Sequence, residues 1–259
     1  MCQQFYFCVS VLSVPDQQGR LSFSISIPER NLVHKTILSA WEELTVNRNF
    51  FTVADDGQFA VFRVETAPFG TNAYLLIDRE NRESILIDAP GDAGLIAGKL
   101  AGTDVKFILL THGHGDHTPA LAELKEKLGA AVACHTGDAA MMPVPPDLLL
   151  EDGHKIRCGE RELQVLHTPG HTKGGLCFLT GGYLFSGDTL FPGGPGKTAT
   201  AEDFRTILSA IEEKLLPLPD ETIVLPGHGQ PTEIEIERKK IEGFKSRYRG
   251  EDLSGDVTW

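Results

Sequence analysis

The sequence predicts an α/β protein in which helices cover β-sheets. Short apolar runs that are typical of buried strands recur along the chain, and segments with helical spacing lie between them. The 259 residues are enough to bury a substantial core. An apolar content of 41% and a charged content of 23% are ordinary for a globular protein.

Residues 1–57 differ from the rest of the chain and are expected to form an N-terminal extension packed on the core, with an oligomerisation element as the alternative. Residues 21–27 alternate apolar and polar side chains, as a half-buried strand does, and residues 31–44 have helical spacing. Residues 55–57, Asp-Asp-Gly, indicate a turn. Residues 58–259 are then the main domain.

Strands of the main domain are predicted at short runs rich in β-branched, Leu or aromatic residues. These runs lie at residues 60–64, 73–77, 84–87, 107–110, 131–134, 163–166, 176–179, 183–185 and 222–225.

Helices are predicted between these strands at residues 91–100, 201–216 and 234–248, and in a segment after residue 117. In that segment Thr118 suits the N-cap, Pro119 the first helical position and Gly129 the C-terminal end. Pro217 is expected to end the helix that begins at residue 201.

Charge and cysteine content narrow the class of partner. The net charge of −12 disfavours nucleic acid, because a phosphate backbone requires a basic face. No apolar run approaches the roughly 18 residues that a membrane span needs. The five cysteines are odd in number and form no C-x-x-C pair, which fits a reducing cytoplasm. We therefore expect a cytoplasmic protein that binds neither nucleic acid nor a membrane, and the sequence leaves its oligomeric state open.

The densest cluster of chemically active side chains is Thr-His-Gly-His-Gly-Asp-His at residues 111–117. Imidazole and carboxylate are ligands that zinc and its first-row neighbours prefer. Glycine spacers let neighbouring side chains in a loop converge on one point. The pattern predicts a metal-binding loop at the end of a buried strand.

Three further candidate ligands each follow a short strand and a glycine turn. His171 lies in Thr-Pro-Gly-His-Thr, Asp188 in Ser-Gly-Asp-Thr-Leu and His228 in Leu-Pro-Gly-His-Gly. A ligand at the end of a strand is held by a rigid element. With the loop, these residues provide five His and two Asp, enough for two metals that share a carboxylate.

With Ile87-Asp88, these motifs resemble those of metallo-β-lactamase-fold hydrolases, and most closely those of the glyoxalase II (hydroxyacylglutathione hydrolase) group. They occur in the family's order between about residues 60 and 235. The resemblance implies an αββα sandwich, that is, two mixed β-sheets face to face with helices outside. Periodicity alone does not distinguish this fold from a doubly wound sheet.

The resemblance also implies the ligand sets and the reaction. One divalent ion would be held by His112, His114 and His171. The second would be held by Asp116, His117 and His228, and Asp188 would bridge the two ions. Both ions are expected to be zinc, with iron or manganese as alternatives. A hydroxide shared by the ions would attack the thioester. Asp116 and Asp188 thus belong to the catalytic centre, Asp116 as a ligand rather than a general base.

Two further residues are assigned from the resemblance. Asp88 would be a carboxylate that orients the metal loop from behind the ligands, although an aspartate before a turn is also a common cap. Lys197 matches a basic residue that contacts the glutathione carboxylate of the substrate, although a solvated lysine is an equal interpretation.

The chain also departs from the glyoxalase II group. Ala199 and Gly229 stand where that group usually has tyrosines, and few residues follow His228 where a helical domain would stand. The acyl group and the thiol carrier therefore remain open. One alternative is a persulfide dioxygenase with a single iron on His112, His171 and Asp188. Another is a lactone or ester hydrolase, whereas Asp188 argues mildly against a β-lactamase.

Overall fold

The computed structural model describes residues 12–15, 21–24 and 50–259, and the chain divides into two units at residues 48 and 49. In the first unit, β1 (Leu12–Pro15) pairs antiparallel with β2 (Leu21–Ser24). The strand predicted at residues 21–27 is confirmed for the part that is described. The helix predicted at residues 31–44 lies outside the described residues.

The second unit contains a seven-stranded mixed sheet with the strand order β3-β4-β5-β6-β7-β8-β9. Pairing is antiparallel from β3 to β6 and parallel from β6 to β9. The strands are β3 (Phe50–Asp55), β4 (Phe59–Thr66), β5 (Thr71–Asp78), β6 (Glu83–Ile87), β7 (Asp104–Leu109), β8 (Ala131–His135) and β9 (Leu148–Leu150).

A six-stranded mixed sheet faces the first, with the strand order β10-β11-β12-β13-β16-β17. Only β13 and β16 pair in parallel within this sheet. The strands are β10 (Lys155–Cys158), β11 (Arg161–His167), β12 (Leu176–Thr180), β13 (Tyr183–Gly187), β16 (Ile223–Pro226) and β17 (Thr232–Glu233). A small hairpin, β14 (Leu190–Phe191) and β15 (Gly194–Pro195), follows β13.

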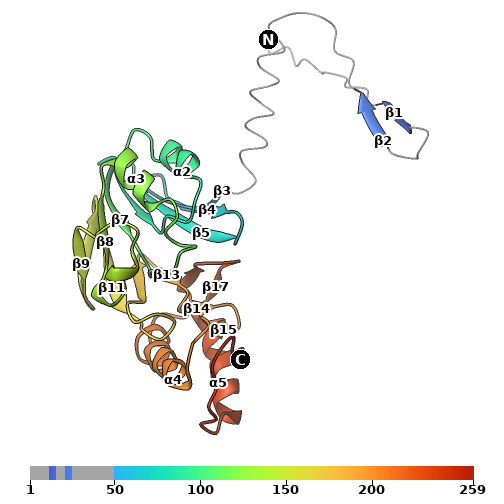
Figure 1. The fold of residues 1–259 in the computed structure, drawn as a ribbon, viewed down its shortest axis with the longest axis vertical. Coiled ribbons are helices and arrows are strands. Elements are labelled where there is room, and N and C mark those ends of the chain that lie inside the picture. Colours follow the sequence, from blue (N-terminus) through green and yellow to red (C-terminus); the bar gives the residue numbers. More distant parts are fainter. Residues whose placement is uncertain (1–11, 16–20, 25–49) are drawn as a thin grey trace, which may run out of the picture. The chain divides into compact units, whose positions relative to one another are not determined.

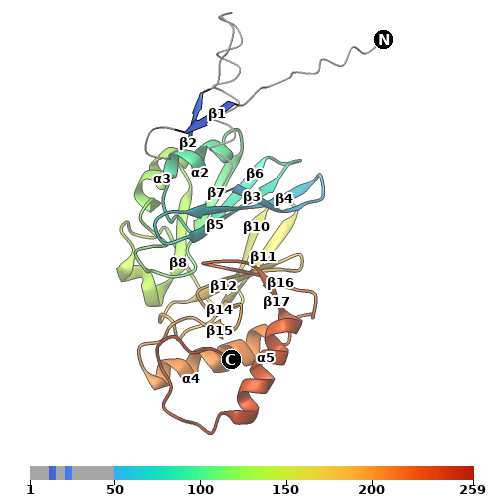
Figure 2. The ribbon, with the colours of Figure 1, turned by 90° about the vertical axis from the view of Figure 1, so that its right-hand side faces the viewer.

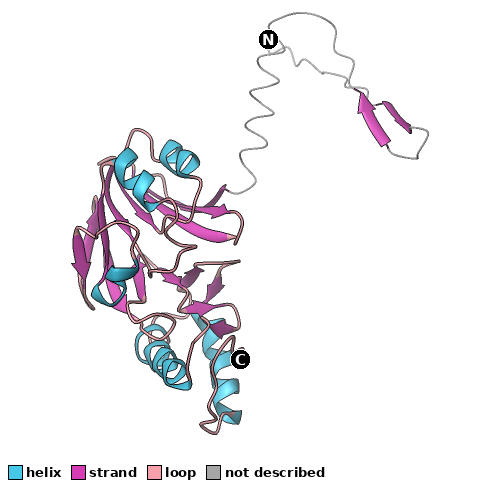
Figure 3. Ribbon diagram, viewed as in Figure 1, coloured by secondary structure: helices cyan, strands magenta, loops and turns pink. Residues whose placement is uncertain are grey.

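Helices cover the outer face of each sheet, as Figures 1 and 2 show for residues 50–259. The first sheet carries α2 (Ala93–Lys99) and α3 (Leu121–Leu128), and the second carries α4 (Ala201–Ala210) and α5 (Ile234–Arg247). A π-helical turn, η3 (Ile211–Leu215), continues α4, and a 3-10 turn, η2 (Thr136–Met141), follows β8. The helix, sheet, sheet, helix layering in Figure 3 confirms the expected αββα sandwich.

Successive side chains of a strand point to opposite faces of its sheet. Because both faces of each sheet carry apolar side chains, both faces are covered. In β5, Tyr74 and Leu76 pack between the sheets, whereas Ala73 and Leu75 pack under α2 and α3. In β12, Phe178 packs between the sheets and Cys177 faces α4 and α5. Three described cysteines, Cys134, Cys158 and Cys177, are buried and form no disulfide, so each packs as a small apolar residue.

The structure differs from the prediction at the start of α3. This helix begins at Leu121 with Ala120 as N-cap, whereas the Thr118 hydroxyl donates to the carbonyl oxygen of His114 at 3.2 Å. The predicted N-cap at Thr118 is therefore wrong, because the metal loop uses that hydroxyl. The capping box of α4 at Thr200 and the left-handed Gly129 after α3 agree with the expected helix ends.

Strand β3 is absent from the predicted strands and belongs to the larger unit. It pairs along its length with β4, so residues 50–55, which the sequence places in the extension, form an edge of the seven-stranded sheet. Its half-exposed pattern hides the alternation on which the prediction relies. Strands β9, β10 and β17 are also absent from the predicted set. Within the described residues, no helix combines the length and apolar character that crossing a bilayer requires.

Candidate metal centre

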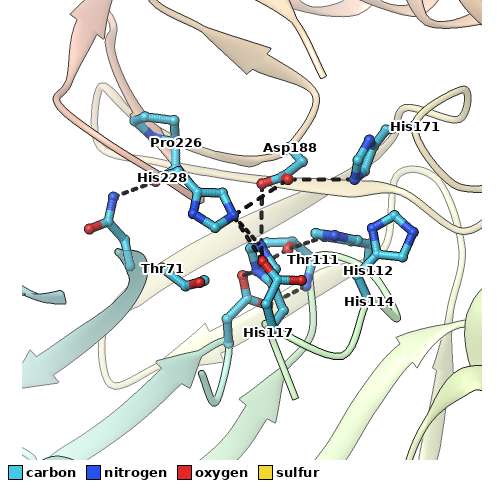
Figure 4. Close-up of polar contacts among 12 residues, drawn as sticks. Thr71, Thr111, His112, His114, His117, His171, Asp188, Pro226 and His228 are labelled. Atoms are coloured by element: carbon cyan, nitrogen blue, oxygen red, sulfur yellow. Dashed lines mark hydrogen bonds and ion pairs between the residues drawn. The ribbon is translucent and has the colours of Figure 1, made fainter. Parts of the chain in front are cut away.

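The seven predicted ligands come from four loops, and each loop follows a strand at the same edge of the sandwich (Figure 4). Residues 112–117 follow β7 of the first sheet. His171, Asp188 and His228 follow β11, β13 and β16 of the second sheet. The structure therefore brings together side chains that lie far apart in the sequence and that belong to both sheets.

His112, His114 and His171 form the first group of donors. One ring nitrogen from each lies within 4.8 Å of the others, and the ring centroids of His114 and His171 are 4.6 Å apart. His112 is buried, and the other two are half-buried. This geometry suits an ion reached from the solvent side.

Asp116, His117 and His228 form the second group. Oδ2 of Asp116 lies 3.1 Å from Nε2 of His228 and 3.7 Å from Nε2 of His117. The two Nε2 atoms are 3.2 Å apart. His117 is fully buried, whereas Asp116 and His228 are half-buried.

Asp188 lies between the two groups. Its Oδ1 is 3.3 Å from Nε2 of His117, and its Oδ2 is 3.5 Å from Nε2 of His171 and 3.7 Å from Nε2 of His228. One carboxylate thus faces histidines of both groups, which is the arrangement that a bridging ligand requires.

Several buried polar atoms of this cluster point toward its interior without a hydrogen-bond partner among the described residues. They are Nε2 of His112, Nε2 of His171 and Oδ1 of Asp188. Such orphaned atoms are costly unless something binds them. Nitrogen and carboxylate donors suit zinc, iron or manganese, so the residues present fit divalent ions.

Burial and neighbouring charges set the protonation of the cluster. Burial, aided by the nearby His117, holds the pKa of His112 well below its ordinary value, and burial together with His171 lowers the pKa of His114. Burial opposes ionisation of Asp188, but the close contact with His117 and the charges of the neighbouring imidazoles outweigh it and lower the Asp188 pKa. Neutral imidazole and ionised carboxylate are the forms that bind metals.

His117 behaves differently because two carboxylates flank it. Burial alone would lower its pKa, but the charges of Asp88 and Asp188 raise it to about 10. Without a metal ion, the two carboxylates thus favour the protonated form of His117. A metal ion at Nε2 of His117 would displace a proton on binding.

Asp88 contacts His117 directly. Its Oδ2 accepts from Nδ1 of His117 at 2.9 Å and from the Thr111 hydroxyl at 2.8 Å, and its Oδ1 accepts from the Thr111 backbone N–H at 2.8 Å. Asp88 is 1% exposed. When the imidazole is neutral, a proton fixed on Nδ1 leaves the lone pair of Nε2 available to bind a metal ion. The Asp88 carboxylate thus lies behind His117, on the side of the ring away from the cluster.

Lys197 contributes its backbone rather than its side chain. Its carbonyl oxygen accepts from Nδ1 of His171 at 2.7 Å, which directs Nε2 of His171 toward Asp188. The Lys197 side chain is exposed, and the neighbouring Thr198 is bridged to Gly255 near the C-terminus. The predicted contact between its ammonium and a substrate stays a prediction.

The loop that carries His228 is held by side chains outside the predicted set. From β5, the Tyr74 hydroxyl and the Asn72 amide donate to the Pro226 carbonyl at 2.7 and 2.9 Å. From β4, Arg63 donates to the Gly229 carbonyl at 2.9 Å. Figure 4 shows Thr71, which is bridged to His228, below this loop. The sequence does carry a signal that could have identified these residues. It is the occurrence of polar side chains, such as Asn72 and Tyr74, at alternate positions of an otherwise apolar strand.

Gly227 illustrates how closely the loops pack. A Cβ at this position would overlap Oδ1 of Asp188 and lie 2.6 Å from Cε1 of His117. Only glycine fits between the two groups. The Pro-Gly-His motif therefore supplies the space for the cluster as well as one of its side chains.

The remaining described histidines stay outside the cluster. His135 and His167 stack on each other with ring centroids 3.9 Å apart, and His154 accepts from the backbone N–H of Glu151. None of them belongs to a group of converging donors in the described part of the chain. His34 lies outside the described residues.

Comparison with known proteins identifies the family. Residues 66–228 match the family model described as "Metallo-beta-lactamase superfamily". The probable metallo-hydrolase YqgX of Bacillus subtilis is 34% identical over 207 residues, which cover 70% of this chain and 97% of that protein.

A hydroxyacylglutathione hydrolase of Cereibacter sphaeroides is 37% identical over 160 residues, which cover 60% of this chain and 61% of that enzyme. The match thus spans about three fifths of the length of that relative. Among solved structures, the protein TTHA1623 in a di-iron-bound form is 33% identical, with a TM-score of 0.59 over 69% of this chain and 98% of that chain. The chain therefore belongs to the metallo-beta-lactamase superfamily, as its motifs predict, and is assigned as one of its hydrolases.

Proposed function

We propose that this chain is a dinuclear metal-dependent hydrolase of thioesters. The observation that carries the proposal is the position of Asp188, whose carboxylate faces His117, His171 and His228 at 3.3 to 3.7 Å. When bound, two divalent ions would lower the pKa of a shared water toward 7 and polarise the substrate carbonyl. Zinc suits the donor set, and the di-iron relative keeps iron as the alternative.

In this proposal, some residues of the chain bind the metal ions and others orient those ligands. The first and second donor groups would each hold one ion, and Asp188 would be shared between them. Asp88 keeps a proton on Nδ1 of His117, and the Lys197 carbonyl does the same for His171. These hydrogen bonds present both Nε2 atoms to the metals in the tautomer that binds. No protein nucleophile is required.

The proposed substrate is a small thioester. The likeness to a hydroxyacylglutathione hydrolase supports this class. Because the match covers only part of that enzyme, the acyl group and the thiol carrier are left to experiment.

Metal analysis combined with a substrate screen tests the proposal. The purified protein should contain two divalent ions per chain and hydrolyse thioesters faster than lactones or persulfides. One iron per chain with oxygen uptake on a persulfide would overturn the proposal in favour of a persulfide dioxygenase. Hydrolysis of lactones alone would point to an ester hydrolase.

We expect His228→Ala to empty the second metal site selectively. His228 contacts Asp116 and His117 but no member of the first group apart from the shared Asp188. Metal content should fall from two ions to about one per chain, measured by elemental analysis after dialysis. Equal loss of both ions would show that the assignment of ligands to two groups is wrong.

We expect Lys197→Ala to raise KM and leave kcat nearly unchanged. The exposed ammonium can reach a substrate carboxylate, and losing one such ion pair costs about 1 kcal/mol, roughly a five- to tenfold rise in KM. The backbone carbonyl that orients His171 survives in this variant.

Steady-state kinetics of Lys197→Ala on a glutathione thioester and an uncharged thioester measure this effect. Lys127→Ala, which removes an exposed lysine of α3, is the matched control. An equal response to both substrates would contradict the role of Lys197 as a carboxylate anchor.

A further inference from the structure

Asp138 is a buried carboxylate outside the predicted metal ligands. It lies in η2, directly after β8, and is 1% exposed. No lysine or arginine of the described residues forms an ion pair with it. A buried charge of this kind is kept in place by hydrogen bonds, because its desolvation is otherwise uncompensated.

The hydrogen bonds of Asp138 connect two loops of the metal centre. Its Oδ2 accepts from the backbone N–H of Gly113 at 2.9 Å, and its Oδ1 accepts from the backbone N–H of Gly174 at 2.7 Å. Gly113 lies between His112 and His114. Gly174 lies in the loop that carries His171 between β11 and β12. One carboxylate therefore joins the three histidines of the first group through their backbones.

The two loops come from different sheets, and at their base one backbone hydrogen bond joins them, from the Leu176 N–H to the Thr111 carbonyl at 2.7 Å. Asp138 adds two hydrogen bonds further along the loops, beside the histidines themselves. The loop after β7 belongs to the seven-stranded sheet, and the loop after β11 belongs to the six-stranded sheet. The packing around the carboxylate is tight, since a Cβ on Gly174 would lie 2.6 Å from Cγ of Asp138. A shift of either loop would break one of the two hydrogen bonds.

We propose that Asp138 is a positioning residue that sets the first metal site by tying the His112–His114 loop to the His171 loop. It contacts no donor atom itself. Its carboxylate holds the loops at the separation at which Nε2 of His112 and Nε2 of His171 converge. The inference rests on the proposed dinuclear function, because it assigns Asp138 to one of the two sites.

Asp138→Asn is the variant that isolates this role. The amide keeps the shape of the side chain, but it offers only one acceptor oxygen, and its NH2 group must face the other backbone N–H. One loop therefore loses its partner while the volume stays the same. Loss of an outer hydrogen bond of this type typically costs roughly 10- to 100-fold in metal affinity.

The experiment measures the two sites separately in the full-length chain. In a His228→Ala background only the first site remains, and in a His114→Ala background only the second remains. Zn²⁺ affinity is measured by competition with a chromophoric chelator, and the visible spectrum of Co²⁺ reports the geometry of the bound ion. Asp138→Asn should weaken Zn²⁺ binding roughly 10- to 100-fold in the first background and less than about twofold in the second.

Two controls separate positioning from general damage. Asp147→Asn changes a carboxylate that also accepts a backbone N–H, from Val132, but touches no metal loop, and it should alter neither affinity. Tyr74→Phe removes a hydrogen bond to the His228 loop and should weaken the second site alone. Circular dichroism of the metal-free variants checks that each one folds.

The outcomes are distinct. Unchanged affinity in the His228→Ala background, or equal weakening in both backgrounds, would overturn the role of Asp138 while leaving the dinuclear proposal intact. A wild-type chain that binds no Zn²⁺ would overturn the proposed function and, with it, the inference.

Discussion

Asp188→Ala is expected to abolish hydrolysis and lower metal content at both sites. The carboxylate of Asp188 lies 3.3 Å from His117 and 3.5 Å from His171, so its removal takes a donor from each ion. It also leaves the imidazoles of His112, His117 and His171 without the negative charge that compensates bound cations. We expect a loss of activity on the order of 10³-fold.

Elemental analysis and thioester hydrolysis measure the effect of Asp188→Ala. Asp252→Ala, which removes an exposed carboxylate paired with Arg205, should keep two ions and full activity. Retention of both metals and of activity in Asp188→Ala would show that this carboxylate does not bridge the sites.

Asp88→Asn is expected to weaken the second metal site and to destabilise the fold. Asp88 has a left-handed backbone with φ of 60°, a conformation that asparagine tolerates, so the variant isolates the carboxylate. The amide offers one acceptor oxygen in place of two, so when that oxygen accepts from the Thr111 backbone N–H, the NH2 group faces Nδ1 of His117. Nδ1 of His117 then loses its acceptor, and the tautomer that presents Nε2 to the metal is no longer fixed.

Metal affinity should fall roughly 10- to 100-fold at the second site, measured by chelator competition. The free energy of unfolding should fall by about 2–4 kcal/mol, measured by urea denaturation, because a buried charged pair is broken. Asp92→Asn is the matched control. It is a left-handed, exposed N-cap in the same segment, and asparagine caps equally well there. Equal destabilisation by both substitutions would contradict the role of Asp88.

The metal-free protein should show a pH dependence of this stability difference. The pKa of His117 is raised in the folded state to about 10, above its ordinary value of 6.5. The stabilisation is therefore complete below about pH 6.5 and is lost as the pH rises through about 10. The gap in unfolding free energy between wild type and Asp88→Asn should narrow over that range. A constant gap would show that the charge pair does not stabilise the fold.

The donor residues and their order could be predicted from the sequence. The glycine-spaced loop at residues 111–117 and the three later motifs each carry a donor directly after an apolar strand. A donor type and its spacing are local properties, so neighbouring residues reveal them without the fold. The αββα sandwich followed from the family resemblance, because apolar periodicity alone also permits a doubly wound sheet.

Other elements escaped prediction for physical reasons. Strand β3 is half-exposed on an edge, so its apolar alternation is weak. Thr118 has the chemistry of an N-cap, but its hydroxyl hydrogen-bonds to the metal loop instead, which moves the start of α3 to Leu121. Tertiary contacts of this kind override local preference.

The sequence by itself therefore determined which side chains can bind metal and on which loops they lie. The tertiary structure alone decided how those side chains are oriented. It placed Asp88 on Nδ1 of His117, 29 residues away, and Tyr74 on the carbonyl before the His228 loop, 152 residues away. The reason is that an orienting hydrogen bond depends on where two strands bring their ends together. Pairing between strands and packing between the sheets set that arrangement, and no local pattern encodes it.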